Sequence, residues 1–170
     1  MLKIIDSIDK LRFFELMGVY EEGNRCNARA FYSHMDARAA VITAEQDFYQ
    51  YLSEVFYETS GAYYAVWEKD GHYVSALRFE PFEDGLLLEG LETAPGERGK
   101  GHASKLMAEV LQTVSVPVYS HVAKENVPSL KTHQKCGFVR YMDHARLIDG
   151  KIDRDMVTLR WMPGNYLKNS

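Results

Sequence analysis

Cysteine is scarce in this chain of 170 residues, which contains only Cys26 and Cys136. Two cysteines are too few for a disulfide scaffold, and such usage is typical of a reducing compartment. The sequence also lacks any apolar run of the roughly 18–20 residues that span a bilayer. Asp6 and Asp9 interrupt the N-terminal segment where a signal peptide would need apolar residues. We therefore expect a cytoplasmic protein that does not enter membranes.

An excess of basic charge is absent as well, because 24 acidic residues outnumber 20 basic ones and give a formal net charge of -4. Proteins that bind nucleic acid usually carry a basic surplus, so we expect no nucleic-acid partner. Hydrophobic residues make up 46% of the chain, which is an ordinary globular proportion. With no linker or internal repeat visible, a single domain over residues 1–170 is predicted.

The first 60 residues predict two helices. Ser7 is placed to cap a helix that runs to about Tyr20, because apolar residues recur there at helical spacing. Thr43 and Gln46 have the spacing of a capping box, which would begin a second helix that Gly61 closes.

From residue 62 onward the pattern alternates between strands and helices. The dipeptides Asp70-Gly71 and Asp84-Gly85 indicate tight turns between strands. A longer helix begins near Gly101, and Asn126 caps a shorter one. The predicted strands are 62–67, 72–80, 86–93, 118–122, 138–148 and 156–161, and residues 2–5 could add a short one.

This order of elements predicts an α/β (α+β) fold built on a mixed sheet of about six or seven strands, with about four helices. Strand 118–122 follows a helical crossover, so it should lie parallel to strand 86–93. Gly90, inside strand 86–93, indicates either a bulge or a close approach of another part of the chain.

The most informative segment is the glycine loop 98–103, which reads Arg-Gly-Lys-Gly-His-Ala and connects a strand to a helix. Backbone N–H groups at such a helix N-terminus, together with the helix dipole, suit a phosphate group. A plain connecting turn would give the same pattern. Two other phosphate motifs fit poorly, because no Ser or Thr follows Lys100 as in a Walker loop, and Ser104 stands where a dinucleotide fingerprint has glycine.

The run LETAPGERGKGHASKLM (91–107) resembles the acetyl-CoA loop of the GNAT-type N-acetyltransferases. Arg98, Gly101 and Ala103 meet the pattern Arg/Gln-x-x-Gly-x-Gly/Ala of that family. A second block, 126–138, is similar to a later motif of the family, which Asn126 and the run Lys-Cys-Gly-Phe at 135–138 match. The resemblance covers residues 86 to about 141 and implies the acyl-CoA N-acyltransferase fold, in which the sheet splays between two parallel central strands.

The resemblance implies that acetyl-CoA is the cosubstrate and that its acetyl group passes directly to an amine in a ternary complex. It also implies that backbone groups at Leu91 and Thr93 hold the pantetheine arm, where one N–H would polarise the thioester carbonyl. Main-chain amides from Lys100 to Ser104 would hold the diphosphate. The expected cofactor-binding residues are Leu91, Thr93, Arg98, Gly99, Lys100, Gly101, His102, Ala103, Ser104, Asn126 and Ser129.

His133 is the first candidate for proton transfer. It stands where many relatives carry a tyrosine that protonates the departing thiolate, and it shares a helix face with Asn126 and Ser129. An imidazolium could donate that proton. Packing against the cofactor, or a hydrogen bond to a neighbour, would equally explain a histidine at this position.

For the base that takes a proton from the ammonium substrate we favour Glu89, then Glu92. Alternation along the strand puts Glu89 on the face of Leu91 and Thr93, unless a bulge near Gly90 swaps the faces. Each glutamate could instead be a solvated carboxylate at the strand end, and a water chain could serve as the base.

The acceptor site should be built by the first two helices, their connection and the last hairpin. Aromatic and acidic residues gather in these parts of the sequence and suit a cationic amine, on a small molecule or a peptide, that carries some apolar surface. The aromatic residues are Phe13, Phe14, Tyr20, Phe31, Tyr32, Tyr63 and Tyr64, and the acidic ones are Glu80, Glu83, Asp84, Glu89 and Glu92.

Three classes of protein compete for this sequence. The first is a working amine acetyltransferase. The second is a non-catalytic acyl-CoA-binding module, which the missing tyrosine would suit, and the third is a nucleotide-binding protein of another fold. The other histidines show no paired ligand spacing, so no metal site is expected. Relatives are often dimers, which makes a homodimer possible, although no long exposed apolar stripe argues for one.

Overall fold

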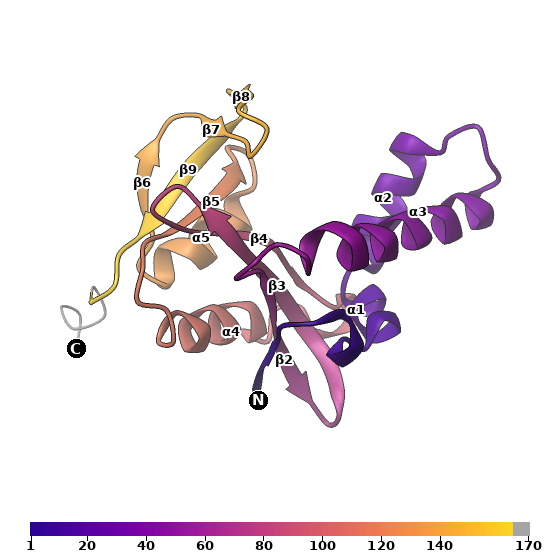
Figure 1. Ribbon diagram of the computed structural model, residues 1–170, viewed down its shortest axis with the longest axis horizontal. Coiled ribbons are helices and arrows are strands. Elements are labelled where there is room, and N and C mark those ends of the chain that lie inside the picture. The colour runs from indigo at the N-terminus through magenta and orange to yellow at the C-terminus, as the bar shows by residue number, and fades with distance from the viewer. Residues whose placement is uncertain (165–170) are drawn as a thin grey trace.

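The computed structural model describes residues 1–164 and places a seven-stranded mixed sheet at the centre of that part of the chain (Figure 1). The strand order is β1-β2-β3-β4-β5-β9-β6, and neighbouring strands are antiparallel except β4 and β5, which are parallel as predicted. The strands of this sheet are β1 Leu2–Ile5, β2 Tyr63–Lys69, β3 His72–Phe82, β4 Gly85–Thr93, β5 Val118–Ala123, β6 Val139–Met142 and β9 Met156–Trp161. The predicted fold class is confirmed.

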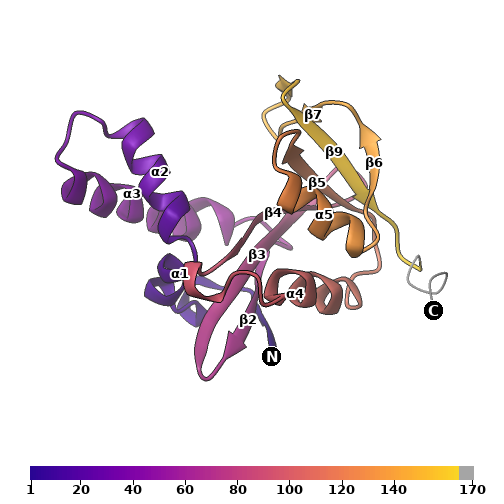
Figure 2. The same ribbon diagram turned by 180° about the vertical axis from the view of Figure 1, so that it is seen from behind.

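Helices cover both faces of the sheet (Figures 1 and 2). One core cluster joins α1 to the face that carries Tyr64 and Ala76, and the other joins α4 to the opposite face, which carries Ala65 and Leu77. No helix within residues 1–164 is both long and apolar enough to cross a membrane. The helices are α1 Phe13–Val19, α2 Glu21–Phe31, α3 Ala37–Tyr51, α4 His102–Leu111 and α5 Val127–Lys135.

The antiparallel helices α2 and α3 form a hairpin that projects away from the sheet, as both ribbon views show (Figures 1 and 2). Its outer part is held together by a small cluster of Ala28, Ala40 and Ala44. Its base reaches the sheet next to β4, where Gly23 of α2 approaches Glu92. The hairpin therefore reaches the sheet at its base.

The single helix predicted over residues 7 to about 20 is wrong. Residues 2–5 form β1, whose pairing with β2 sets Leu2 opposite Trp67, so the chain is extended up to Ile5. Ser7 then begins only a 3-10 turn, Ile8–Lys10, and its side chain caps nothing. Helix α1 starts at Phe13, and α2 starts anew after Tyr20. Extended backbone at Leu11 (φ -81°, ψ 123°) separates the 3-10 turn from α1, and the helical spacing of the apolar residues does not reveal this break.

The capping box predicted at Thr43 and Gln46 is also wrong. Helix α3 begins earlier, where Asp36 Oδ1 accepts hydrogen bonds from the N–H groups of Arg38 and Ala39, both at 3.1 Å. Thr43 lies near the middle of the helix that this cap starts. Asp36, which precedes an alanine-rich run, is the residue that caps the start of this helix. Thr43 and Gln46 have the spacing of a capping box, but both lie inside the continuous helix.

Most later strands agree with the prediction, including the turn at Asp70-Gly71, where both residues have positive φ (50° and 82°). The continuous strand predicted over 138–148 is wrong. A register shift lies between Arg140 and Met142, and the pairing of β6 with β9 ends at Met142. The chain then leaves the main sheet and forms a separate two-stranded sheet from β7 Ala145–Arg146 and β8 Ile152–Asp153.

Candidate active site

The parallel strands β4 and β5 pair only at their beginning. Their ladder sets Leu86 opposite Val118, Leu87 opposite Tyr119 and Leu88 opposite Ser120, and it ends there although both strands continue. The two strands then part, and a cleft of about 760 Å³ lies between them. The main-chain edge of β4 beyond Leu88 thus faces the cleft instead of a neighbouring strand.

A bulge at Gly90 controls the side chains along that edge. Gly90 has φ +58°, and the pairing of β4 with β3 jumps from Arg78–Glu89 to Ala76–Glu92. The bulge therefore puts Glu89 and Glu92 on one face of the sheet, whereas Leu91 packs against the core on the other. Glu89 therefore does not share a face with Leu91, and of the two arrangements left open by the sequence the one with a bulge near Gly90 is present.

Tyr20 holds this bulge in place from the end of α1. Its hydroxyl donates a hydrogen bond of 2.7 Å to the Gly90 carbonyl, and a Cβ at Gly90 would lie only 3.0 Å from the hydroxyl oxygen. Burial raises the pKa of Tyr20 well above its usual value, so the phenol stays protonated and remains a donor. Both alternatives predicted for Gly90, a bulge and a close approach, are confirmed.

The glycine loop presents its main chain at the N-terminus of α4. Gly99 and Gly101 have φ +75° and +81°, a region that side chains rarely adopt, although a Cβ at either position would meet no atom. The first backbone bond of the helix runs from Lys105 N–H to the Gly101 carbonyl. Within residues 1–164 no protein group accepts from the N–H groups of 99–104, which leaves them available to an anion.

The basic side chains of the same loop are already paired with carboxylates. Lys100 Nζ lies 3.0 Å from one oxygen of Glu97, and His102 Nε2 lies 2.9 Å from the other. Arg98 Nη1 lies 2.6 Å from Glu22 Oε2 on α2. The hydrogen bond from Lys100 holds the pKa of Glu97 down at about 2. The loop therefore offers an anion main-chain donors, in line with the sequence prediction, more than free positive charge.

Helix α5 lines the opposite wall of the cleft. Asn126 caps it by accepting a hydrogen bond of 3.2 Å from the Ser129 N–H, as predicted. Cys136 follows the helix and is buried, and burial raises the pKa of its thiol to about 11, so it stays an unreactive packing group. The predicted site residues that line the cleft are Glu89, Leu91, Glu92, Thr93, Arg98, Ala103, Asn126, Ser129 and His133, whereas Gly99, Lys100, Gly101, His102 and Ser104 lie outside its lining.

His133 is almost completely buried, with 1% of its surface exposed. Its Nδ1 lies 2.9 Å from the Ser129 carbonyl and its Nε2 lies 3.0 Å from the Ser120 hydroxyl. Burial lowers the pKa of the ring, which favours the neutral form. A proton donor to a thiolate would need a second ring proton, so this environment favours a different use of His133 from the acid role predicted from its position.

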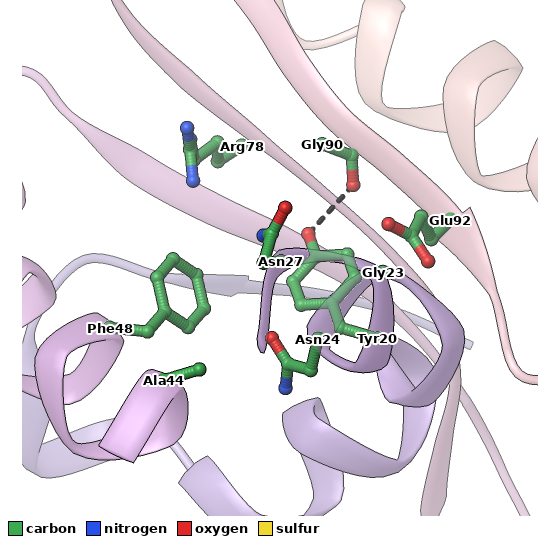
Figure 3. A pocket seen from close by; sticks show the side chains of 9 residues that line it. All are labelled: Tyr20, Gly23, Asn24, Asn27, Ala44, Phe48, Arg78, Gly90 and Glu92. Carbon is green, nitrogen blue, oxygen red and sulfur yellow. Dashed lines mark hydrogen bonds between the residues drawn. The ribbon is translucent and has the colours of Figure 1, made fainter. Parts of the chain in front are cut away.

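A second, smaller cavity of about 160 Å³ lies on the other side of β4, between that strand and the base of the α2–α3 hairpin (Figure 3). Its walls combine two aromatic rings, two amides and two charged groups. Gly90 and Glu92 belong to both this cavity and the larger cleft. The lining residues are Tyr20, Gly23, Asn24, Asn27, Ala44, Phe48, Arg78, Gly90 and Glu92.

Some of the segments predicted to build an acceptor site line this cavity. The N-terminal helices do line it, but none of its lining residues comes from the last hairpin. Of the seven predicted aromatic residues only Tyr20 faces it. Phe14 and Phe31 are exposed (85% and 73%), and Tyr64 is fully buried in the core beneath the sheet. A count of aromatic residues could not separate lining, core and surface positions.

The carboxyl groups of Glu80, Glu89 and Glu92, near this cavity, differ in burial and in hydrogen bonding. Burial raises the pKa of Glu92. Glu89 Oε2 accepts hydrogen bonds from Arg78 Nε and Nη2, at 3.2 and 3.0 Å. Burial, followed by the neighbouring Glu89, raises the pKa of Glu80 to about 7. Of these three carboxyl groups, Glu89 is the one that binds the Arg78 guanidinium.

Sequence reasoning missed several residues of the site. Arg78 and Ser120 stand singly within strand patterns and carry no motif. Gly23 did leave a signal, since it is an isolated glycine inside a helix. Its reason is steric, because a Cβ at this position would lie 2.7 Å from Glu92 Oε1. Glycine on α2 thus makes room for the Glu92 carboxylate.

Comparison with known proteins places this geometry in a family context. A family model described as Acetyltransferase (GNAT) family matches residues 21–138. No curated protein matches the chain. Many solved structures share the fold. Because those compared below are less than 20% identical to this chain, they show similarity of fold alone.

Three of these structures are acetyltransferases with different names. The N-acetyltransferase PaiA from Thermoplasma acidophilum, in complex with coenzyme A, is 12% identical, with a TM-score of 0.61 over 95% of this chain and 99% of that one. An aminoglycoside 6'-acetyltransferase type Ii is 11% identical, with a TM-score of 0.62 over 95% and 96%. A ribosomal-protein-alanine N-acetyltransferase from Brucella melitensis is 17% identical, with a TM-score of 0.60 over 95% and 99%.

Proposed function

Because the chain belongs to the acetyltransferase (GNAT) family, whose acyl donor is acetyl-CoA, we propose that it acetylates a small primary amine by direct attack in a ternary complex. One observation carries this proposal. Gly90 and Glu92 line both the cleft between β4 and β5 and the smaller cavity behind β4. An amine in the smaller cavity would therefore meet an acyl group in the cleft beside the Glu92 carboxylate.

The residues around the cleft fit acetyl-CoA. The free N–H groups of 99–104 suit its diphosphate, because main-chain donors at a helix N-terminus bind phosphate without a charged side chain. The edge of β4 between Glu89 and Thr93 can bond the pantetheine amides in the manner of an added strand. Bound in this way, acetyl-CoA supplies the activated acetyl group. A main-chain N–H at the bulge would polarise the thioester carbonyl.

Glu92 is the better candidate for the base, ahead of Glu89. Only a neutral amine attacks a thioester, so a group in the site must accept the ammonium proton. Burial raises the pKa of Glu92, which makes its carboxylate a stronger proton acceptor. The Glu89 carboxylate is already committed to two N–H groups of Arg78. The base order expected from the sequence is thus reversed in this proposal.

The size of the cavity limits the acceptor. A volume of about 160 Å³ is close to that of a cavity of about 150 Å³ that holds benzene. The rings of Tyr20 and Phe48 offer apolar contacts and favour a cation, and Asn24 and Asn27 add polar ones. A compact alkyl or arylalkyl amine fits this space whole. An amino sugar or a peptide, the acceptor classes named for two of the similar structures, could enter only through a narrow amine-bearing end.

The test is the release of free CoA thiol from acetyl-CoA with a panel of amines. We expect compact cationic primary amines to be acetylated, and amino acids or other anionic amines to react poorly. Tertiary amines of the same shape are the matched control, because they bind but accept no stable acetyl group. Acetylation of polar or anionic amines alone would refute the acceptor class.

A thermal-shift measurement with acetyl-CoA separates the rival function. Stabilisation by acetyl-CoA without thiol release for any amine would indicate an acyl-CoA-binding module. Stabilisation by NAD but not by acetyl-CoA would contradict the whole assignment of the cleft.

A further inference from the structure

Ser120 and His133 form a pair that direct transfer to an amine does not use. Ser120 Oγ lies 3.0 Å from His133 Nε2, and Nδ1 of the same ring lies 2.9 Å from the Ser129 carbonyl. A hydroxyl, an imidazole and a fixed acceptor for the second ring nitrogen are the parts of a nucleophile, its base and the group that orients the base.

The hydrogen-bond partners assign the direction of each bond. A carbonyl oxygen only accepts, so the ring donates to Ser129 from Nδ1, and a neutral ring then accepts at Nε2. The Ser120 hydroxyl is therefore the donor to His133. Its other acceptor, the Leu88 carbonyl, is farther away at 3.2 Å. The base thus holds the lone pair that can take the hydroxyl proton.

The pair stands where an acyl group would arrive. Ser120 faces Leu88 at the last rung of the β4–β5 ladder, at the point where the two strands part. Ser120 and His133 are 2% and 1% exposed, yet both line the cleft of about 760 Å³. These exposed fractions are those of the empty cleft, so an acyl group in the cleft meets Ser120 over a small part of its surface. Beyond Leu88 the main-chain edge of β4 can supply N–H donors to a developing oxyanion.

We infer that Ser120 and His133 are a nucleophile–base pair that hydrolyses acetyl-CoA through an acetylated Ser120 when no amine occupies the acceptor cavity. This inference rests on the proposed function in one respect, namely that acetyl-CoA lies in the cleft between β4 and β5. It adds a second reaction, with water as the final acceptor, to the same binding site.

The reaction balances without any further reactant. Ser120 Oγ attacks the thioester carbonyl carbon and its proton passes to His133 Nε2. The C–O bond forms, the C–S bond breaks, and the proton moves from Nε2 to the sulfur, so CoA leaves as the thiol. Water then attacks the serine ester and gives a proton to Nε2, which returns it to Oγ as the ester bond breaks. One acetyl-CoA and one water become one CoA and one acetic acid.

The test looks for the acetylated serine itself. The full-length protein is incubated without amine, with acetyl-CoA in one sample and with p-nitrophenyl acetate in another. Each sample is quenched in acid and its peptides are sequenced by mass spectrometry. We expect one acetyl group on Ser120 from both donors, and free CoA thiol accumulating in the first sample.

Three variants define the pair. Ser120→Ala and His133→Gln should lose the adduct and lower the amine-independent hydrolysis at least about a hundredfold, as the loss of a nucleophile or of its base does. Glutamine keeps a hydrogen-bond acceptor for Ser120 but is not basic. Thr158→Val is the matched control, because Thr158 is a buried strand hydroxyl beside His121 that lies outside the cleft lining, and it should keep the adduct.

The outcomes separate this inference from the proposed function. An adduct from p-nitrophenyl acetate but not from acetyl-CoA would support the pair and place the failure in the binding of acetyl-CoA. Absence of an adduct from both donors would overturn the inference. Amine-independent hydrolysis of acetyl-CoA at the wild-type rate by Ser120→Ala or by His133→Gln would overturn it as well. The hydrogen bond between the two residues would then have a structural role only.

Discussion

The proposed donor side and the proposed acceptor side of this site are formed by different kinds of groups. The donor side, from β4 through α5, relies on main-chain groups, which are the N–H groups of 99–104 and the free edge of β4. The acceptor side relies on side chains that α2, α3 and β3 bring together around Glu92. A main-chain site needs only a few glycines at fixed spacing, whereas a side-chain pocket can be lined in many ways. The family pattern is therefore readable on the donor side alone.

The two sides also treat charge differently. On the proposed donor side, the cations Arg98 and Lys100 keep 45% and 50% of their side chains exposed. Exposed pairs of this kind contribute little to stability and can exchange partners when an anion arrives. On the proposed acceptor side, Arg78 and Glu89 are only 19% and 31% exposed, so removal of one partner leaves the other charge less well solvated. The Arg78–Glu89 pair is thus harder to break than the pairs of Arg98 and Lys100.

The largest expected effect breaks the acceptor side alone. Glu92→Gln should lower kcat for amine acetylation about 10²- to 10⁴-fold, since it removes the base. The thermal shift with acetyl-CoA should persist. The wild-type rate should rise with pH as Glu92, whose pKa burial raises, loses its proton, and this rise should vanish in the variant. If Glu89→Gln abolishes the pH-dependent rise and Glu92→Gln keeps it, the base is Glu89.

The next change breaks the donor side alone. Gly101→Val should weaken acetyl-CoA binding at least about tenfold, because φ +81° costs an L-residue roughly 1–2 kcal/mol and the loop must change shape. The fold should survive, since a Cβ there meets no atom. Gly96→Val is the matched control, with equally open space but without positive φ. Titration of the thermal shift measures both, and equal binding by the two variants would contradict this account of the loop.

A smaller effect tests how the two sides are joined. Gly23→Ala should stabilise α2 by up to about 1 kcal/mol but lower kcat several-fold, because its Cβ would lie 2.7 Å from Glu92 Oε1 and displace the carboxylate. Gly18→Ala, on α1, meets nothing within 4 Å and should gain helix stability without a loss of rate. Thermal melting and steady-state kinetics distinguish these results. Unchanged kcat in Gly23→Ala would show that Glu92 does not need this clearance.

The smallest expected effect is on the pH dependence of stability and concerns Glu80. The pKa of Glu80 is raised from 4.5 to about 7 by burial and by Glu89, so the folded protein holds this proton more tightly than the unfolded chain. Its contribution to stability is therefore complete below pH 4.5 and is lost as the pH rises through about 7. Glu80→Gln should match the wild type in melting temperature at pH 5 and exceed it slightly at pH 8. A variant that is less stable at pH 8 would contradict this.

The sequence predicted turns and helix caps correctly where they depend on a few neighbouring residues. The dipeptide Asp70-Gly71 and the Asn126 cap depend on neighbouring residues only, and both appear as expected. The N-terminal helix failed because Leu11 has extended backbone between the 3-10 turn and α1, a break that the spacing of apolar residues does not show. The face on which Glu89 lies depends instead on pairing between strands. Gly90 indicated a bulge in the sequence. Which face of the sheet the side chains after Gly90 point to follows from the pairing of β4 with β3.

The sequence by itself determined the main-chain features of the donor side, because glycines that must adopt positive φ and an asparagine that caps a helix act over a few residues. Only the tertiary structure decided which side chains line the cleft and the smaller cavity. It brought Gly23 and Tyr20 against β4, placed Arg78 beside Glu89, and set Ser120 against His133. These contacts join residues on different elements, from 11 to 70 positions apart. Their chemistry depends on burial and distance, which no short run of residues encodes.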